Sequence, residues 1–238
     1  MSGGINKILS ALLTYPTPEI KAAAPEMQSI VEAEAKLATP LRDELLALIH
    51  DLALGDLYDL QERYVLLFDR TRSLSLYLFE HVHGESRDRG QAMVDLQNLY
   101  ETHGLYLTAK ELPDFIPLFL EFLSTRPDQQ ASDLLAQTAH IFAALAERLA
   151  KRQSPYEAVF RALVALAASV PKGEDVSALL QQADPDPNDL AALDAAWEDQ
   201  PVSFGAGAGN GCKDELIARI RAGRRPAPGT QPAREPQA

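Results

Sequence analysis

The sequence predicts an all-α fold, a single multi-helix bundle with a flexible C-terminal region. Leucine and alanine, which favour helices, dominate the 238 residues. Apolar residues recur every three or four positions in most segments, as one buried helix face requires, and strand-like alternation is absent from the sequence. Hydrophobic residues make up 46% of the chain, enough for a sizeable core. We therefore expect about ten helices packed in one bundle.

Proline, glycine and capping residues mark the ends of these helices. A capping residue followed by proline predicts helix starts at Thr17 and Ser154, and Pro113-Asp114 predicts another start. Gly104 predicts the end of the long helix before it. The expected helices cover about residues 5–12, 17–24, 25–37, 40–54, 56–69, 86–103, 113–123, 127–152 and 155–170, with short pieces at 176–180, 190–197 and 216–220.

Three parts are expected along the chain. Residues 1–172 form the helical core, residues 173–222 an acidic and loosely attached helical region, and residues 223–238 a disordered tail without apolar anchors. The glycine-rich run at 205–211 indicates a flexible linker, because no strand precedes it and the Walker spacing is missing.

Charge is distributed unevenly. The net charge is −12, yet five arginines (219, 221, 224, 225 and 234) against Glu235 give the last twenty residues a balance of +4, so the rest carries −16. An acidic body repels nucleic acid and anionic membranes and attracts a basic peptide. The alternative is that acidity only keeps the protein soluble.

Cysteine content and hydropathy restrict the class further. Cys212 is the only cysteine, which excludes a disulfide within the chain and a cysteine-based zinc site. The N-terminus lacks the small-residue cleavage site of a signal peptide, and no apolar run approaches the ~20 residues that span a bilayer. We expect a cytoplasmic protein without direct membrane insertion.

A charged turn lies between two apolar helix faces in the stretch from 75 to 123. The turn, residues 80–89, contains His81 and His83 among acids and arginines. It is either a capped, salt-bridged turn or a recognition surface beside a groove. A rival interpretation is a metal-dependent helical enzyme using both histidines, although HExxH is absent. The preceding residues 74–82 are compatible with helix or extended chain.

Eight aromatic residues at helical spacings predict a core, with some rings lining a groove that accepts an amphipathic helix. They are Tyr64, Phe68, Tyr77, Phe79, Tyr100, Phe115, Phe119 and Phe122. No Ser/His/Asp order stands out and no carboxylate is isolated in an apolar setting, so nothing in the sequence indicates catalysis.

Several motifs together carry a family resemblance. They are FEHVHGESRDRGQAM at 79–93, HGL at 103–105, ELPDFIPLFLEFL at 111–123, YVLLFDR at 64–70, WE at 197–198 and PVSF at 201–204. With them the chain resembles the NarJ family of nitrate reductase molybdenum cofactor assembly chaperones, which is similar to the wider TorD/DmsD-like redox enzyme maturation chaperones. The resemblance spans most of residues 1–220 and is densest at 64–123.

The resemblance implies a TorD-like helical bundle that is not an enzyme and acts in the cytoplasm. The implied partners are the N-terminal peptide of the nitrate reductase catalytic (alpha) subunit, the apoenzyme, and cofactor-delivery proteins. The chaperone would hold the apoenzyme until the molybdenum cofactor is inserted and the complex docks with its membrane subunit, with no cofactor bound stably to itself. A family member serving another molybdoenzyme is the alternative.

The wider family also implies where the peptide binds. Its Pro-Asp-His element contributes to the peptide site; here Pro113 and Asp114 match, and Phe115 replaces the histidine, which leaves apolar contact at that position. The candidate peptide-binding residues are Tyr64, Phe68, Phe79, Glu80, His81, His83, Glu85, Arg87, Arg89, Tyr100, Pro113, Asp114, Phe115, Leu118, Phe119, Glu121 and Phe122.

Overall fold

The computed structural model describes residues 3–83, 87–107 and 111–182, together with Asp184, Asp186 and Ala191. In these ranges the chain is all-α, which confirms the predicted fold class. The helices are α1 (Gly3–Leu12), α2 (Pro18–Ala22), α3 (Ala24–Ala33), α4 (Thr39–Leu54), α5 (Leu57–Phe68), α6 (Leu78–His83), α7 (Arg87–Thr102), α8 (Ile116–Ser124), α9 (Asp128–Lys151), α10 (Glu157–Leu166) and α11 (Gly173–Leu180), with a 3-10 turn η1 (Arg72–Leu74).

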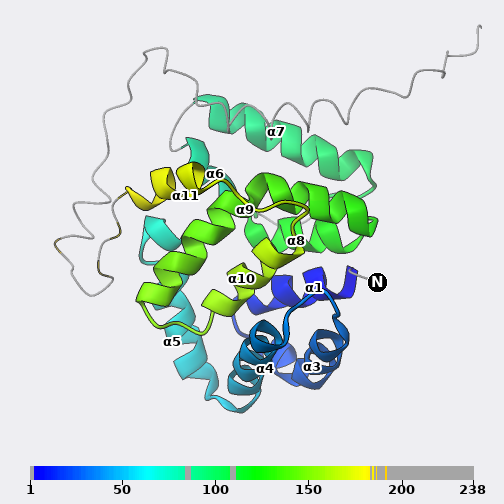
Figure 1. The fold of residues 1–238 in the computed structure, drawn as a ribbon, viewed down its shortest axis with the longest axis vertical. Helices are drawn as coiled ribbons and strands as arrows, with labels where there is room; N and C mark the ends of the chain where they lie inside the picture. Colours follow the sequence, from blue (N-terminus) through cyan, green and yellow to red (C-terminus); the bar gives the residue numbers. More distant parts are fainter. Residues whose placement is uncertain are drawn as a thin grey trace, which may run out of the picture.

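The longest helix, α9, lies at the centre of the bundle, with α10 packed along it (Figure 1). A second tight pair is α1 with α8, and α11 covers another side of α9. The helices α3 and α4 pack on each other next to α1, while α5 lies at one edge of the molecule and α7 crosses the opposite end (Figure 1). The first and last described helices therefore share one bundle with the segment from 75 to 123.

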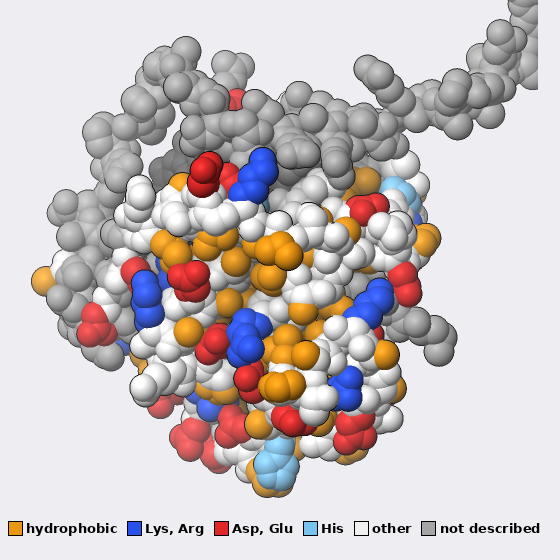
Figure 2. Space-filling view, viewed as in Figure 1, with side chains coloured by type: hydrophobic (Ala, Val, Ile, Leu, Met, Phe, Trp, Pro, Cys, Tyr) orange, Lys and Arg blue, Asp and Glu red, His pale blue; other side chains and the backbone are white. Residues whose placement is uncertain are grey.

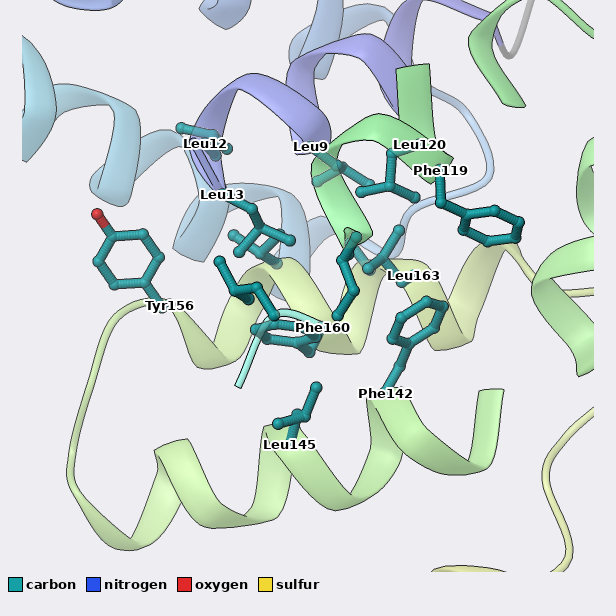
Figure 3. Close-up of a cluster of buried hydrophobic side chains, with 14 of the residues drawn as sticks. Leu9, Leu12, Leu13, Phe119, Leu120, Phe142, Leu145, Tyr156, Phe160 and Leu163 are labelled. Carbon is teal, nitrogen blue, oxygen red and sulfur yellow. The ribbon is translucent and has the colours of Figure 1, made fainter. Parts of the chain in front are cut away.

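The core fills the space where four helices meet (Figure 3). Leucines of α1 and α8 point toward Phe160 and Leu163 of α10, and Phe142 and Leu145 of α9 approach from the other side. The rings of Phe142 and Phe160 lie 6.2 Å apart, and both side chains are fully buried. Burial of each such side chain contributes roughly 1.5–3 kcal/mol, so this junction holds the bundle together.

Two predicted boundaries are confirmed, with identifiable causes. Thr17 caps α2, because its hydroxyl oxygen accepts the backbone N–H of Ile20 at 3.3 Å. Gly104 ends the turn after α7 with a φ of +79°, a left-handed conformation that glycine adopts at little cost. The expected helix at 86–103 thus matches α7 within one residue at each end.

Two predicted starts are wrong. The Ser154 side chain accepts the N–H of Tyr156 at 3.4 Å and holds a turn, so α10 begins only at Glu157. Pro113-Asp114 does not open α8, which begins at Ile116. Asp114 is used instead by a distant helix, as described below, and long-range pairing of this kind leaves no trace in local sequence.

The region after residue 172 is represented by α11. Val176 and Leu179 of α11 are buried against the bundle, and Arg148 of α9 donates to the carbonyl oxygens of Leu179 and Ser73, both at 2.7 Å. The division expected at residue 172 stays a prediction. The pieces expected at 190–197, apart from Ala191, and at 216–220 lie outside the described residues, as does the tail.

The described surface mixes apolar and acidic areas. Figure 2 shows hydrophobic side chains open to solvent across the middle of one face, with acidic side chains gathered along its lower edge. No helix in the described ranges is both long and apolar enough to cross a bilayer.

A candidate peptide-binding surface

An open hollow of about 480 Å³ runs along the outer face of α5. It is lined by Tyr15, Tyr58, Gln61, Glu62, Val65, Leu66 and Arg70. Five of these residues follow one another at helical spacing on α5, and Tyr15 comes from the loop after α1. The hollow is therefore a strip about as long as α5 itself, a shape suited to a helix laid alongside.

The hollow exists because α5 is apolar on two faces. Its inner face buries Leu60, Tyr64, Leu67 and Phe68. Its outer face leaves Tyr58 80% exposed and the neighbouring Val65 and Leu66 only half-buried. A surface helix normally has a single apolar stripe, so the second stripe makes this face the candidate surface for a partner.

A row of packed aromatic rings connects Tyr15, which lines the hollow, to the buried inner face of α5. Tyr15 meets Tyr64 edge-on at 5.6 Å, Tyr64 contacts Phe68 at 5.1 Å, and Phe68 meets Tyr156 at 5.1 Å. The Tyr64 hydroxyl donates to the carbonyl of Leu13 at 2.9 Å. Burial raises the pKa of Tyr64 well above its ordinary value, so this phenol stays neutral and keeps the hydrogen bond.

A further hydrogen bond fixes the wall. The Gln61 amide donates to the carbonyl of Pro16 at 2.9 Å and ties α5 to the loop that carries Tyr15. Because both walls are held by buried rings and hydrogen bonds, the hollow is preformed, which lowers the ordering cost of binding.

The rim of the hollow is mostly acidic, although Arg70 is part of its lining. Asp56, Asp59, Glu62 and Asp69 are all exposed along α5 and its ends. Arg63, the basic residue inside the helix, points away, because it pairs with Asp51 at 2.5 Å and lies over the ring of Tyr156. The field along α5 therefore favours a ligand with positive charge.

The segment predicted to hold the site is built around Asp114. Its backbone carbonyl accepts the N–H of Leu78 at 3.0 Å, and its carboxylate accepts the N–H of Phe79 at 3.1 Å. Ile116 donates to the carbonyl of Leu76 at 2.8 Å and completes a short antiparallel bridge. Asp114 thus satisfies the free N–H groups at the start of α6 from 35 residues away.

Burial dominates the electrostatics of this carboxyl. Asp114 is fully buried, and desolvation raises its pKa above the ordinary value. Its Oδ1 has no hydrogen-bond partner among the described residues. Positive charge on Arg89 acts in the opposite direction and lowers the pKa of Asp114, though by less than burial raises it. The group is a structural cap held at an electrostatic cost.

Most of the predicted aromatic candidates lie in the core rather than on a surface. Phe79, Tyr100, Phe119 and Phe122 are at most 1% exposed. Tyr100 donates to the carbonyl of Pro113 at 2.8 Å, and its ring lies 4.8 Å from that of Phe122. In this conformation these rings position α7 and α8. Tyr64 and Phe68, also buried, lie beneath the hollow on α5.

Of the two histidines expected in the turn, the structure describes the side chain of His81 but not that of His83. The buried His81 ring donates from Nε2 to the carbonyl of Ser75 at 2.8 Å, and desolvation lowers its pKa to about 4. The side chains of His83, Glu85 and Arg87 lie outside the described part of the chain. Within the described part, no three His, Cys, Asp or Glu side chains converge as metal ligands would.

The remaining candidates form a second surface area. Arg89 pairs with Glu80 at 3.4 Å, both half-buried, and the half-buried Leu118 and exposed Glu121 lie on α8. The Phe115 ring lies 5.4 Å from Tyr77, whose hydroxyl donates to Glu111 at 3.3 Å. Burial raises the pKa of Tyr64 most, and Tyr77 and Glu111 add smaller contributions in the same direction.

The sequence prediction missed the lining of the hollow itself. Tyr15, Tyr58, Gln61, Val65 and Leu66 were absent from the candidate set, although the helix that carries most of them was expected. The available signal was that apolar residues of the stretch 57–68 occur on two helix faces instead of one.

The structure thus combines an all-helical bundle with an apolar hollow along α5, a shape in which an amphipathic helix can bind. Residues 34–162 match the model of the nitrate reductase delta subunit family. The chain is 43% identical over 211 residues to the nitrate reductase molybdenum cofactor assembly chaperone NarJ of Escherichia coli K12, covering 88% of each chain. It therefore belongs to the nitrate reductase delta subunit family, as its motifs predicted.

Two further relatives extend the comparison. The probable nitrate reductase molybdenum cofactor assembly chaperone NarW of Escherichia coli K12 is 40% identical over 200 residues, covering 84% of this chain and 83% of the relative. The probable chaperone NarJ of Bacillus subtilis strain 168 is 31% identical over 173 residues, covering 73% of this chain and 93% of the relative.

Proposed function

We propose that this protein is an assembly chaperone that binds the N-terminal segment of the respiratory nitrate reductase catalytic subunit. It keeps the apoenzyme competent for molybdenum cofactor insertion and for docking with the membrane subunit. One observation carries the proposal: an acid-rimmed apolar hollow lies along α5 in a chain 43% identical to an assembly chaperone. The protein acts in the cytoplasm, before the client reaches its membrane partner.

Apolar contact supplies the affinity in this mechanism. A client side chain that covers Val65 or Leu66 removes apolar area from water at roughly 25 cal/mol per Å², before the cost of ordering the client. Tyr58, which is 80% exposed, has the most area to lose. A short amphipathic helix with two or three apolar anchors fits the strip along α5.

The acidic rim supplies orientation and rate. Asp59 and Glu62 lie on the exposed side of the strip and attract basic residues that flank the client's anchors. These two acids and Arg70 lie at different ends of the hollow. Basic residues of the client are attracted to the acidic end and repelled by Arg70, so the client helix binds in one direction.

The molybdenum cofactor is cargo of the client in this proposal. The chaperone performs no chemistry on it and binds none of it stably; it holds the apoenzyme in a form that cofactor-delivery proteins can load. When the mature client buries its own segment, that segment leaves the hollow and the chaperone dissociates, so the chaperone is not part of the finished enzyme.

Titration calorimetry of the full chain with the client's N-terminal peptide tests the proposal. We expect saturable binding that Tyr58→Glu weakens at least about tenfold, because the substitution removes an apolar contact and adds like charge to the rim. Val94→Glu on α7 is the matched control, since Val94 is also exposed, at 52%, but distant along the chain from the hollow. Absence of binding to the folded, intact protein would overturn the proposal.

The second surface area is tested in the same titration. Glu121→Lys and Leu118→Ser change the exposed part of α8 without touching α5. If these substitutions abolish binding and Tyr58→Glu leaves it unchanged, the client lies against α8 and not in the hollow. Co-purification from nitrate-respiring cells identifies the client, and recovery of a different molybdoenzyme would overturn its assignment.

A further inference from the structure

We propose that the protein's own C-terminal segment, residues 213–225, binds in the hollow along α5 and competes there with the client. The competition rests on the proposed function of the hollow, whereas the contact itself does not. The segment lies outside the described residues, and three observations point to it: its sequence pattern, its charge, and the position of Asp184 near the hollow.

The segment has the pattern of an amphipathic helix. Leu216, Ile217 and Ile220 fall on one face at helical spacing. Its remaining positions are rich in positive charge, with Lys213, Arg219, Arg221, Arg224 and Arg225 against Asp214 and Glu215. The apolar residues match the apolar hollow, and the basic residues match its acidic rim.

Charge complementarity favours this segment over other parts of the same chain. The last twenty residues carry +4 while the rest carries −16. The rim of the hollow, with Asp56, Asp59, Glu62 and Asp69 exposed, is one of the places where that acidity gathers next to apolar surface. A basic tail on an acidic body is attracted to such a place by the field of the whole molecule.

Asp184, one of the last described residues, lies close to one end of the hollow. Asp184 accepts hydrogen bonds from Ser73 Oγ and from Arg152 Nη2, both at 2.6 Å. Ser73 is three residues along the chain from Arg70, which lines the hollow, and three residues span at most about 11 Å. The path from Asp184 to the hollow is therefore short.

The intervening sequence is long enough to make the connection. It includes the glycine-rich run at 205–211, and a coil of the length between Asp184 and Lys213 has a root-mean-square span of roughly 30 Å. A tether of this kind gives an effective concentration on the order of millimolar. Even a segment with a dissociation constant of about 1 mM would then fill roughly half of the hollows.

The consequence is a cover for the hollow before the client arrives. The tail shields exposed Tyr58 and its neighbours from self-association, and a tighter client displaces it. The client's apparent affinity is proportional to the fraction of hollows that the tail leaves open. It therefore falls roughly twofold when the tail fills half of the hollows and tenfold when it fills nine-tenths.

The single cysteine provides a direct test on the full chain. A nitroxide attached at Cys212 lies at the start of the segment, so a docked tail broadens the methyl NMR signals of Val65 and Leu66. The methyl signals of Val94 on α7 serve as the internal reference, and the chemically reduced label as the diamagnetic control. Addition of excess client peptide should restore the Val65 and Leu66 signals.

Paired variants separate apolar docking from a loose charge effect. Ile217→Asp with Ile220→Asp removes the apolar face, whereas Ala218→Asp with Ala222→Asp adds the same charge on the opposite face. We expect only the first pair to abolish the broadening fully and to raise client affinity the full twofold to tenfold. Equal effects of the two pairs would overturn docking through the apolar face.

The outcomes also distinguish this proposal from the proposed function. No selective broadening at Val65 and Leu66, with normal client binding, overturns the tail contact and leaves the chaperone function standing. Selective broadening without client binding supports the tail contact and overturns the function. Broadening in a mixture where label and isotopes are on different molecules would show contact with a second copy and would overturn the intramolecular arrangement.

Discussion

Asp114 shows how one buried carboxyl organises several elements. It caps α6 through its carboxylate, pairs through its backbone with Leu78, and directly follows Pro113, which accepts the Tyr100 hydroxyl. Its Oδ1 has no hydrogen-bond partner among the described residues, so the charged form is poorly compensated. The residue therefore stabilises the fold more when it is neutral than when it is ionised.

The first prediction follows from the raised pKa of Asp114. A pKa higher in the folded than in the unfolded protein means that the stabilisation is full below the unfolded pKa and is lost as pH rises through the folded pKa. Relative to Asp114→Asn, the wild type should therefore lose free energy of unfolding between pH 4 and pH 7. Urea denaturation of both proteins across this range measures the difference, and a constant difference would contradict the prediction.

The cap itself gives a second comparison at the same residue. At low pH, where Asp114 is neutral, Asp114→Ala removes the acceptor for the N–H of Phe79 and should cost about 1–3 kcal/mol, whereas Asp114→Asn keeps an acceptor and should cost less. The same denaturation series reports both values.

His81 titrates in the opposite sense. Burial lowers its pKa to about 4, below the ordinary value near 6.5, so its stabilising contribution is present above the unfolded pKa and lost as pH falls through the folded pKa. We expect the wild type to lose about 1–3 kcal/mol more than His81→Gln between pH 7 and pH 4. Equal losses in the two proteins would show that folding does not lower the pKa of His81.

At the scale of elements, one glycine inside α7 and one just after it have opposite effects on stability. Gly90 lies inside the helix with open space around its Cα, while Gly104 follows the helix with a φ of +79°. Helix interiors disfavour glycine, and left-handed positions favour it. The two residues therefore form a matched pair in one part of the fold.

Alanine substitutions test this pair. Gly90→Ala should stabilise the protein by about 0.5–1 kcal/mol, because alanine loses less conformational freedom on helix formation. Gly104→Ala should destabilise it by about 1 kcal/mol, because a Cβ is strained at positive φ. Thermal unfolding measures both, and the same sign for the two variants would contradict the assignment of the α7 boundary.

The helix α5 has a different kind of element-scale property. Its inner stripe packs into the core, and its outer stripe lines the hollow that we propose as the binding surface. Tyr64 is buried and supports the fold, whereas Tyr58 on the same helix is exposed at the hollow.

At the scale of the whole molecule, net charge controls encounter more than affinity. The chain carries −12, and acidic residues rim the hollow. Raising ionic strength from about 20 to 200 mM should therefore slow association of a basic client peptide at least about threefold, with a smaller change in dissociation. Stopped-flow fluorescence measures both rates.

Two neutralising variants localise this effect. Glu62→Gln on the rim should weaken the salt dependence of association, while Glu147→Gln, exposed on α9, should change it less. An association rate that does not respond to salt would contradict electrostatic steering at the hollow.

The sequence alone determined the fold class and the family, since periodic apolar residues and caps act locally and the motifs at 64–123 are specific. It also placed Tyr64, Phe68, Tyr100, Phe119 and Phe122 correctly in helices. Phe115, expected inside a helix, instead pairs with Tyr77 in a β-bridge just before α8. It failed at Pro113-Asp114 and at Ser154, because the partner of Asp114 lies 35 residues away and local signals do not encode distant hydrogen bonds.

Only the tertiary structure decided which side of each helix remains for a partner. Phe79, Tyr100 and Phe122 are aromatic or apolar in sequence like Tyr58, Val65 and Leu66, yet the first three are buried in the bundle and the others are not. The reason is physical: exposure depends on what the surrounding helices leave uncovered, and periodicity shows only that a face is apolar. The outer face of α5 is where this bundle leaves such a surface open.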